Sequence, residues 1–534
     1  MGKGTSHIIR AFVSLAMAGS LMCATAGCST DPLTGTATTS PSATTAASTG
    51  HVALFLPSNS PNLSQNVPLN NWNTLNDSLE NALSTGGFSG KSMNRETSGS
   101  LASQSDALKR YVQERLNADS KEQYGDPQTE QGATTIVIAP AVRLDRNYGE
   151  YSHFITTPNQ EPSDQDASDT DSDESSSMRQ IADSLNKAKN AGMHVVVLGN
   201  PIDGFVPNVY VPLVTAADIG RMQAQQIVSK LDLDAVSESN PKAIEVLLPN
   251  TDPSGKNNSF QAQAFEGIWE VLGPYFRQRK AYSPSQRLSF FTTKSDYKDV
   301  MFKATKDSQI EDELKSRLET KGRDAAVRID GILAMNDFTA AASIKALKTM
   351  GYSGSSMDVN PSITIFDVVG NIAGRKPLNR QRVPDPAQSG DESAQPSQTT
   401  KTDSKQWPII TGFGAYISDI PNIVNGLQWM TGLVDVHANT GTIAQIALQL
   451  NRKEKLSNIA ELKTSDDYGS EIPTLHMTLL AVSAANLKAA LIDPGYISLA
   501  VMCRWDAIRN REPAESALDA GMTPDRDSPC AQCA

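Results

Sequence analysis

The feature that most constrains this chain is a repeated alternation of short apolar runs with segments of helical length. Apolar runs such as HVALFLPS at 51–58, GATTIVIAPA at 132–141 and MHVVVLGNP at 193–201 are typical of buried strands. Each run is followed or preceded by a stretch with the spacing of an amphipathic helix, at 71–88, 101–116 and 178–192. Strands that alternate with helices of this length favour a parallel sheet with crossover helices.

The same alternation continues through the second half of the chain. Helices are expected at 216–231, 258–276, 306–322 and 338–352, and strands at 243–250, 288–293, 329–337, 362–368 and 407–416. The β-α units form two sets of four or five rather than one long series. The predicted fold class is therefore α/β, with two doubly wound parallel-sheet lobes.

The first 50 residues are expected to lie outside this fold. Residues 1–28 carry two basic residues, then an apolar run rich in small residues, which is typical of a secretory signal. The run reaches Cys28 through Thr25, Ala26 and Gly27, which resembles a bacterial lipobox, although Thr25 stands where Leu is usual. We expect acylation of Cys28, with a plain signal peptide as the alternative. The Ser/Thr-rich residues 29–50 are predicted to form a disordered tether.

Charge and metal-ligand spacing exclude several classes of function. The formal net charge is -12, and no basic face predicts contact with nucleic acid. The six histidines have no metal spacing, and the C-x-x-C at 530–533 lies in a polar tail, so no metal or cofactor is expected. An acidic stretch at 157–178 and a polar stretch at about 384–405 are predicted to be disordered surface insertions.

Four segments resemble the sugar receptors of bacterial ABC importers, of the type I periplasmic-binding fold and the xylose-binding type. They are GKNNSFQAQAFEGIWEVLGPYF (255–276), IDGILAMNDFTAAASIKALKTMGY (329–352), IPNIVNGLQWMT (420–431) and LAVSAANLKAALIDPGYISLAVMC (480–503). The family order and separations are kept, and the resemblance covers roughly residues 51–504. It implies two lobes joined by a multi-crossover hinge, with a ligand cleft between the lobes. The implied first-lobe segments are 51–214 and 429–463, the second-lobe segments are 215–428 and 464–508, and a tail follows at 509–534.

The resemblance also implies a set of ligand contacts. Asn336 and Asp337 match the family's Asn-Asp pair at a strand end, with helix capping by Asp337 as the alternative. The other positions that it implies are Asn257 and Asn258 in the Asn-Asn loop, Trp72 after the first strand, Asn200, and Gln428 at the hinge crossover. His437 and Asp435, just beyond the hinge, are expected to begin a helix. A catalytic role is not expected for them, because no nucleophile or third orienting group accompanies them.

The chain departs from the family pattern where a charged sugar clamp is usual. Gly199-Asn200 replaces Asp-Arg, and residues 412–416 read Gly-Phe-Gly-Ala-Tyr. The resemblance and the lipobox together nevertheless imply a non-enzymatic, monomeric, lipid-anchored binding protein on the extracellular face of the cell membrane. It would deliver a sugar-like solute to ABC permease subunits. The alternative is a degenerate surface or sensory protein of the same fold that no longer binds free sugar.

Overall fold

The computed structural model describes most of the region expected to fold. It covers residues 49–59, 68–122, 133–142, 146–156, 169–319, 327–356, 405–466 and 468–498, all within one compact unit at 48–534. Cys28, the tether, the insertion at about 384–405, the expected strand at 362–368 and the C-terminal tail lie outside the described residues. Within the described residues, no helix has the length and apolar character needed to cross a membrane.

The first sheet has seven strands in the order β13-β14-β5-β4-β3-β1-β2. Its strands are β1 (His51–Pro57), β2 (Met93–Ser98), β3 (Thr134–Ile138), β4 (His194–Leu198), β5 (Val209–Val211), β13 (Lys463–Ser465) and β14 (Ile472–Thr474). All neighbours are parallel except the pair β13–β14 at the edge. The strand order reverses at β1, which pairs with β2 on one side and β3 on the other, so the carboxyl ends of β1 and β3 form a topological switch point.

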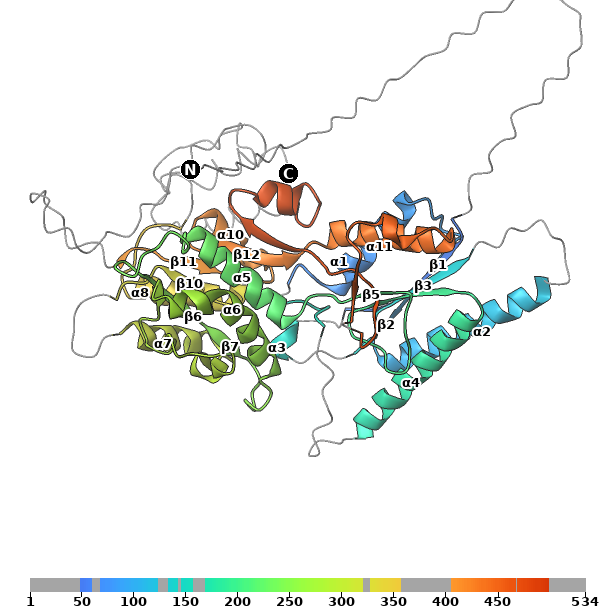
Figure 1. The fold of residues 1–534 in the computed structure, drawn as a ribbon, viewed down its shortest axis with the longest axis horizontal. Helices are drawn as coiled ribbons and strands as arrows, with labels where there is room; N and C mark the ends of the chain where they lie inside the picture. Colours follow the sequence, from blue (N-terminus) through green and yellow to red (C-terminus); the bar gives the residue numbers. More distant parts are fainter. Residues whose placement is uncertain are drawn as a thin grey trace, which may run out of the picture. The chain divides into compact units, whose positions relative to one another are not determined.

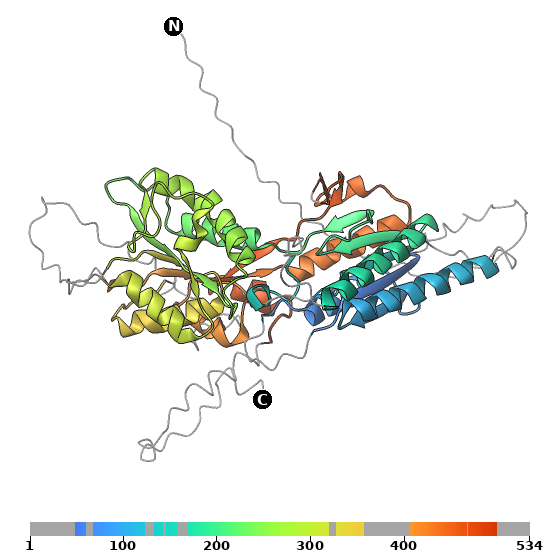
Figure 2. The ribbon, with the colours of Figure 1, turned by 90° about the horizontal axis from the view of Figure 1, so that it is seen from below.

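Helices cover both faces of this sheet because alternate strand residues point to opposite faces. Ala53 and Phe55 pack against α2 (Leu101–Glu122) and α4 (Asp169–Asn190). Val52 and Leu54 face the opposite side and pack with α1 (Trp72–Thr85) and α11 (Val436–Asn451). The helices of each pair lie side by side (Figures 1 and 2). The sheet is therefore doubly wound, as expected.

The second sheet has four parallel strands in the order β11-β10-β6-β8. They are β6 (Lys242–Val246), β8 (Ala281–Tyr282), β10 (Gly331–Leu333) and β11 (Ile409–Thr411), and β6 is followed by β7 (Leu248–Asn250), which pairs with β9 (Met301–Lys303). One face packs on α5 (Ala216–Lys230) and α6 (Ser259–Arg277), the other on α7 (Asp307–Leu318) and α8 (Asp337–Thr349). Most side chains on both faces are apolar and buried, which explains the apolar runs of the sequence, and the buried charged residues Lys242 and Glu245 of β6 are exceptions.

Two helical glycines set the close approach of α5 and α6. A Cβ at Gly220 would stand 2.2 Å from the Ala264 carbonyl oxygen, and one at Gly267 would stand 2.0 Å from that of Ala217. Each helix therefore presents a glycine to the other's backbone, and a larger residue at either position would force the two helices apart.

The chain crosses between the two sheets three times. It passes from β5 through α5 into the second sheet, returns from β11 through β12 (Met430–Val434) to α11, and leaves β14 for β15 (Leu479–Ser483). β12 and β15 pair antiparallel and form the hinge strands, and Phe413 bridges to Gly432 beside them. The short α10 (Ile420–Val424) precedes this hinge. The expected multi-crossover connection is thus present, with α/β lobes built on parallel sheets.

Several expectations about individual segments were wrong. Residues 288–293 form turns rather than a strand, and the edge of the second sheet is the short β8 instead. β2 was not predicted, because MNRETS is polar and only half-buried at the sheet edge. Of the stretch at 157–178 that was expected to be disordered, residues 169–178 belong to α4, and Ser177 is already buried, while residues 157–168 lie outside the described residues. β13 and β14 belong to the first sheet, although residues from 464 onward were expected in the second lobe.

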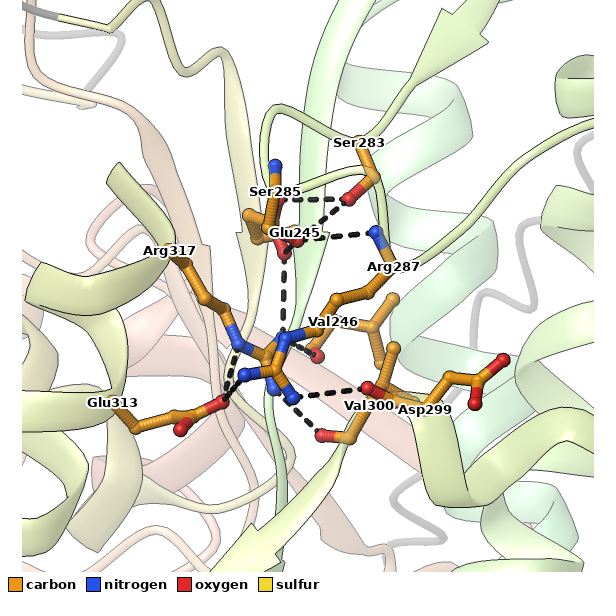
Figure 3. Close-up of polar contacts among 9 residues, drawn as sticks. All are labelled: Glu245, Val246, Ser283, Ser285, Arg287, Asp299, Val300, Glu313 and Arg317. Atoms are coloured by element: carbon orange, nitrogen blue, oxygen red, sulfur yellow. Dashed lines mark hydrogen bonds and ion pairs between the residues drawn. The ribbon is translucent and has the colours of Figure 1, made fainter. Parts of the chain in front are cut away.

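A buried ion pair holds α7 on the second sheet (Figure 3). The side chains of Arg317 on α7 and Glu245 on β6 are both fully buried, with Nη1 to Oε2 at 3.3 Å. Arg317 also donates to the carbonyls of Val246 and Val300, each at 2.7 Å, and pairs with Glu313 at 2.8 Å. Every face of the guanidinium therefore has a partner, which is the condition under which a buried charge is tolerated.

Candidate functional site

The candidate ligand residues follow the strands at the two switch points. In the first sheet these strands are β1 and β3, and in the second sheet they are β6, extended by β7, and β10. Trp72 begins α1 after β1, Asn257 and Asn258 follow β7, and Asn336 and Asp337 follow β10. Ligands of open α/β sheets bind outside the carboxyl ends of such strands. The topology therefore places these candidates where a ligand is expected.

Asp337 is the centre of the polar network at this end of the second sheet. It is 1% exposed, and its Oδ1 accepts a hydrogen bond from Gln428 Nε2 at 2.7 Å. Its Oδ2 accepts from Thr431 Oγ1 at 2.7 Å and from the Tyr416 amide at 3.1 Å. The backbone of Gly412 approaches so closely that a Cβ there would stand 2.2 Å from Oδ1. The β10 strand end and the hinge strand β12 are thus joined through one carboxylate.

Burial raises the pKa of Asp337 to about 6, although the hydrogen bonds from Thr431, Gln428 and the backbone oppose that change. Asp419 is a second perturbed carboxyl group. Burial first, and then the charge of Asp337, raise its pKa to about 7. The pKa values of both carboxyl groups therefore lie near neutral pH, because both groups are shielded from water beside the hinge.

Asn336 does two things at the start of α8. Its Oδ1 caps the helix by accepting from the Thr339 amide at 2.8 Å, while its Nδ2 stands 3.5 Å from Glu150 Oε2. The preceding residue, Met335, has φ of 55°, a left-handed conformation that is costly for a side chain of this type. Helix capping by Asn336, rather than by Asp337, leaves Asp337 free to face the hinge. The Tyr416 hydroxyl donates to the carbonyl of Glu150 as well.

The Asn-Asn loop lies before α6 and is held by Asp252. The Asp252 carboxylate accepts from the amide of Asn257 at 2.9 Å, and the hydrogen bonds that it accepts, from Ser254 above all, lower its pKa to about 2. Asn257 Oδ1 accepts from Ser259 Oγ at 3.1 Å. Asn258 occupies the N-cap position of α6 but makes no side-chain capping bond, and it is half-buried.

Asn147 provides a second polar centre, which joins the segment after β3 to the second sheet. It lies in α3 (Arg146–Gly149) and is 2% exposed. Its Oδ1 accepts from the Thr251 amide at 2.9 Å, from Thr251 Oγ1 at 3.1 Å and from Gln261 Nε2 at 3.1 Å. Its Nδ2 donates to the Asn257 carbonyl at 3.2 Å. The whole amide is therefore bound by groups of the second sheet and α6.

The structure brings several of the predicted residues into contact with one another or with one shared segment. Asp337 and Gln428 are bonded directly, and Asn336, Asn257 and Trp72 all contact residues between 147 and 154. Trp72 packs edge-on against Phe154, with ring centroids 5.6 Å apart. Asn200 is half-buried and follows β4, which ends at Leu198. Among the described residues, no group of His, Cys, Asp or Glu is arranged to hold a metal ion.

Sequence reasoning missed the segment at 146–156. It was assigned to the first lobe without a role, yet Tyr148, Tyr151 and Phe154 are among its most deeply buried side chains. The available signal was the aromatic density of NYGEYSHF, which is unusual for a surface loop next to an acidic insertion. The helix expected from Asp435 and His437 is confirmed as α11, with the Asp435 carboxylate as its N-cap.

Comparisons with known proteins find similarity at the level of solved structures. No protein-family model and no curated protein matches the chain. A solute-binding protein of an ABC transporter from Clostridium phytofermentans, with bound β-D-glucose, is 15% identical, with a TM-score of 0.43, and the match covers 84% of this chain and 99% of that one. A carbohydrate transporter solute-binding protein from Chloroflexus aurantiacus, in complex with D-glucose, is 18% identical, with a TM-score of 0.43 and coverage of 84% and 97%.

A third similar structure is the Caulobacter myo-inositol binding protein bound to myo-inositol, at 12% identity and a TM-score of 0.36, with coverage of 83% of this chain and 96% of that one. These structural neighbours are solute-binding proteins that hold small polyhydroxylated ligands. Identity is low throughout, so what this chain binds has to be argued from its own residues.

Proposed function

We propose that this chain is the solute-binding protein of an ABC importer and that it binds a carbohydrate-like solute. The observation that carries the proposal is the set of buried hydrogen-bonding side chains beyond the ends of β7 and β10, which comprises Thr251, Gln261, Asn336 and Asp337. Carboxylate and amide groups suit the vicinal hydroxyls of a sugar, and aromatic rings suit its apolar face. The resemblance to the xylose-binding type is in keeping with such a ligand. No enzymatic role is proposed.

The proposal extends to the place where the protein works. Acylation of Cys28 would hold it on the extracellular face of the cell membrane, and the tether at 29–50 would let a monomer reach the permease subunits. The two lobes, at 51–214 with 429–463 and at 215–428 with 464–508, would close on the ligand about β12 and β15. Because β14 pairs with β5 and β13 pairs with β14, we assign residues 463–474 to the first lobe and shift the last boundary accordingly.

The test is calorimetric titration of the wild type with D-glucose, D-xylose and myo-inositol, repeated with Asn336→Ser. Serine caps a helix about as well as asparagine, so this change should keep α8 stable and remove only the amide group. We expect affinity to fall by roughly tenfold, because a ligand hydroxyl would lose a partner. Thr215→Ser, at the capping box of α5, is the matched control and should leave affinity unchanged. Equal affinities for all three proteins would exclude Asn336 from the site.

One observation favours the second candidate function, a protein of the same fold that binds no free sugar. Residues 147–154 already occupy the polar and aromatic partners that a ligand would need. A ligand that binds only the folded state raises the melting temperature. If the segment is a permanent part of the core, none of the three sugars will bind, and none will raise the melting temperature. The two candidates therefore differ in whether the segment can leave.

A further inference from the structure

The segment at 146–156 satisfies a set of groups that would suit a small polar ligand. Around the Asn147 amide, Thr251 contributes an amide and a hydroxyl donor, Gln261 contributes an amide donor, and the Asn257 carbonyl accepts. All four contacts lie between 2.9 and 3.2 Å. Three donors meet the Oδ1 atom and one acceptor meets the Nδ2 atom. Such a set matches hydroxyl groups as well as it matches an amide, because a hydroxyl both donates and accepts.

An aromatic surface lies next to these polar groups. The Tyr151 ring packs on Phe260, with centroids 4.2 Å apart and an interplanar angle of 31°, and Phe413 lies 6.4 Å away. Phe260 is the second residue of α6, directly after Ser259, whose hydroxyl contacts the Tyr148 hydroxyl at 3.1 Å. Polar groups beside an exposed aromatic face are what a pyranose ring requires. Here that face is covered by a tyrosine of the same chain.

The fit of the segment is incomplete at two atoms. The Tyr151 hydroxyl and the Gln261 carbonyl oxygen are both buried and have no hydrogen-bond partner among the described residues. Unsatisfied buried groups weaken the docked arrangement, since each loses its water without gaining a partner. A hydroxylated ligand could donate to Gln261 and would leave no tyrosine hydroxyl buried.

We propose that Thr251, Asn257, Phe260 and Gln261 form a recognition site for a neutral polyhydroxylated ligand, and that the resting protein fills it with its own Asn147 and Tyr151. Ligand binding then requires the segment at 146–156 to leave. This inference rests on the proposed function, because it names the site and the regulation of the same binding activity. The apparent affinity equals the intrinsic affinity multiplied by the fraction of molecules in which the segment is undocked.

The docked segment is hydrogen-bonded to residues beside both sheets, and these hydrogen bonds must break when it leaves. On the second-sheet side the segment is held by the partners of Asn147 and by the Tyr416 hydroxyl, which donates to the Glu150 carbonyl. The 3.5 Å separation of Asn336 Nδ2 and Glu150 Oε2 is too long to hold the segment strongly. On the first-sheet side the His153 amide donates to the Asn70 carbonyl at 3.1 Å, and the Thr156 amide donates to the Val214 carbonyl at 2.9 Å. Release from the second sheet alone would keep the segment tethered beside β5, ready to return.

Hydrogen–deuterium exchange without any ligand tests displacement by itself. In the wild type, amides at 147–152 should exchange faster than those of β3 and β10, because they open locally rather than by global unfolding. Asn147→Ala should speed exchange in this segment by roughly tenfold and leave β3 unchanged. The matched control is Asn451→Ala, which removes a buried asparagine with three hydrogen bonds on α11. It should not act selectively on the segment.

Two results would contradict the proposal that the segment is displaced. One is protection of the segment equal to that of β3 in the wild type. The other is an Asn147→Ala variant whose exchange rises equally everywhere. Tyr151→Phe is a second variant, which should change exchange of the segment in the opposite direction and is less harmful to folding than Asn147→Ala. It removes a buried hydroxyl without a partner and should therefore slow exchange in the segment by several-fold.

Calorimetry with D-glucose tests the recognition site. Asn147→Ala should bind D-glucose roughly tenfold more tightly than the wild type, Tyr151→Phe more weakly, and bound D-glucose should speed exchange at 147–152. Binding of D-glucose to the wild type with unchanged exchange in the segment would refute the inference and leave the proposed function standing. Absence of binding to every variant, with D-xylose and myo-inositol as well, would refute the proposed function. Even then, hydrogen–deuterium exchange of the ligand-free protein would show whether the segment at 146–156 opens.

Discussion

The carboxyl group of Asp337 should make the folded protein less stable as the pH rises from acid to neutral. In the folded state burial raises its pKa to about 6, whereas the ordinary value in an unfolded chain is 3.8. An acid that keeps its proton longer in the folded state stabilises folding below the unfolded pKa, and this contribution is lost as the pH rises through the folded pKa. The interval between the two values corresponds to about 3 kcal/mol, about half of it lost by pH 5.

Asp337→Asn isolates this effect because asparagine resembles the protonated acid in shape and charge. We expect the free energy of unfolding of the variant, minus that of the wild type, to rise by about 3 kcal/mol between about pH 3.5 and about pH 7.5. The sign is positive because only the wild type has to ionise a buried group. Loss of the Asp337 charge also relieves the raised pKa of Asp419, which acts in the same direction.

Urea unfolding followed by circular dichroism at a series of pH values provides the measurement. Asp312→Asn, at an exposed position on α7, corrects for the loss of a surface charge. A difference that stays constant with pH, or falls, would refute the reasoning. It would mean that the hydrogen bonds from Gln428, Thr431 and the Tyr416 amide outweigh the cost of burial and hold the carboxylate ionised.

Three further changes test other parts of the structure. Arg317→Ala should lower the free energy of unfolding by about 3–5 kcal/mol in urea titrations, because its carboxylate partner would stay buried without a counter-charge (Figure 3). Arg95→Ala, at an exposed ion pair, should change it little. Gly412→Ala should cost about 1–3 kcal/mol or more, since the new methyl group meets the site carboxylate, whereas Gly441→Ala on the open face of α11 should stabilise by up to about 1 kcal/mol. Cys28→Ser should move the protein from the membrane fraction to the medium, and equal retention on membranes would count against acylation.

The sequence determined most elements and the class of fold, because strands buried on both faces of a parallel sheet need apolar residues at nearly every position. Each central strand is a short apolar run, and each crossover helix carries a periodic apolar stripe, so both can be recognised locally. Elements with little burial leave a weaker trace. For this reason the polar edge strand β2 was missed, and the apolar pair Phe290-Phe291 suggested a strand where the chain forms exposed turns.

The candidate site was predictable only as far as strand ends are predictable. Asn336, Asp337 and Gln428 could be proposed because they follow recognisable strands or the hinge motif. Tertiary structure alone decided that Asp337 is bonded to Gln428 across 91 positions of chain, and that Asn147 reaches Thr251 across 104. Such contacts depend on which strands become neighbours and on where an irregular segment packs. Neither has a local periodicity, so the aromatic segment that fills the site was visible in the sequence only as an unexplained cluster of rings.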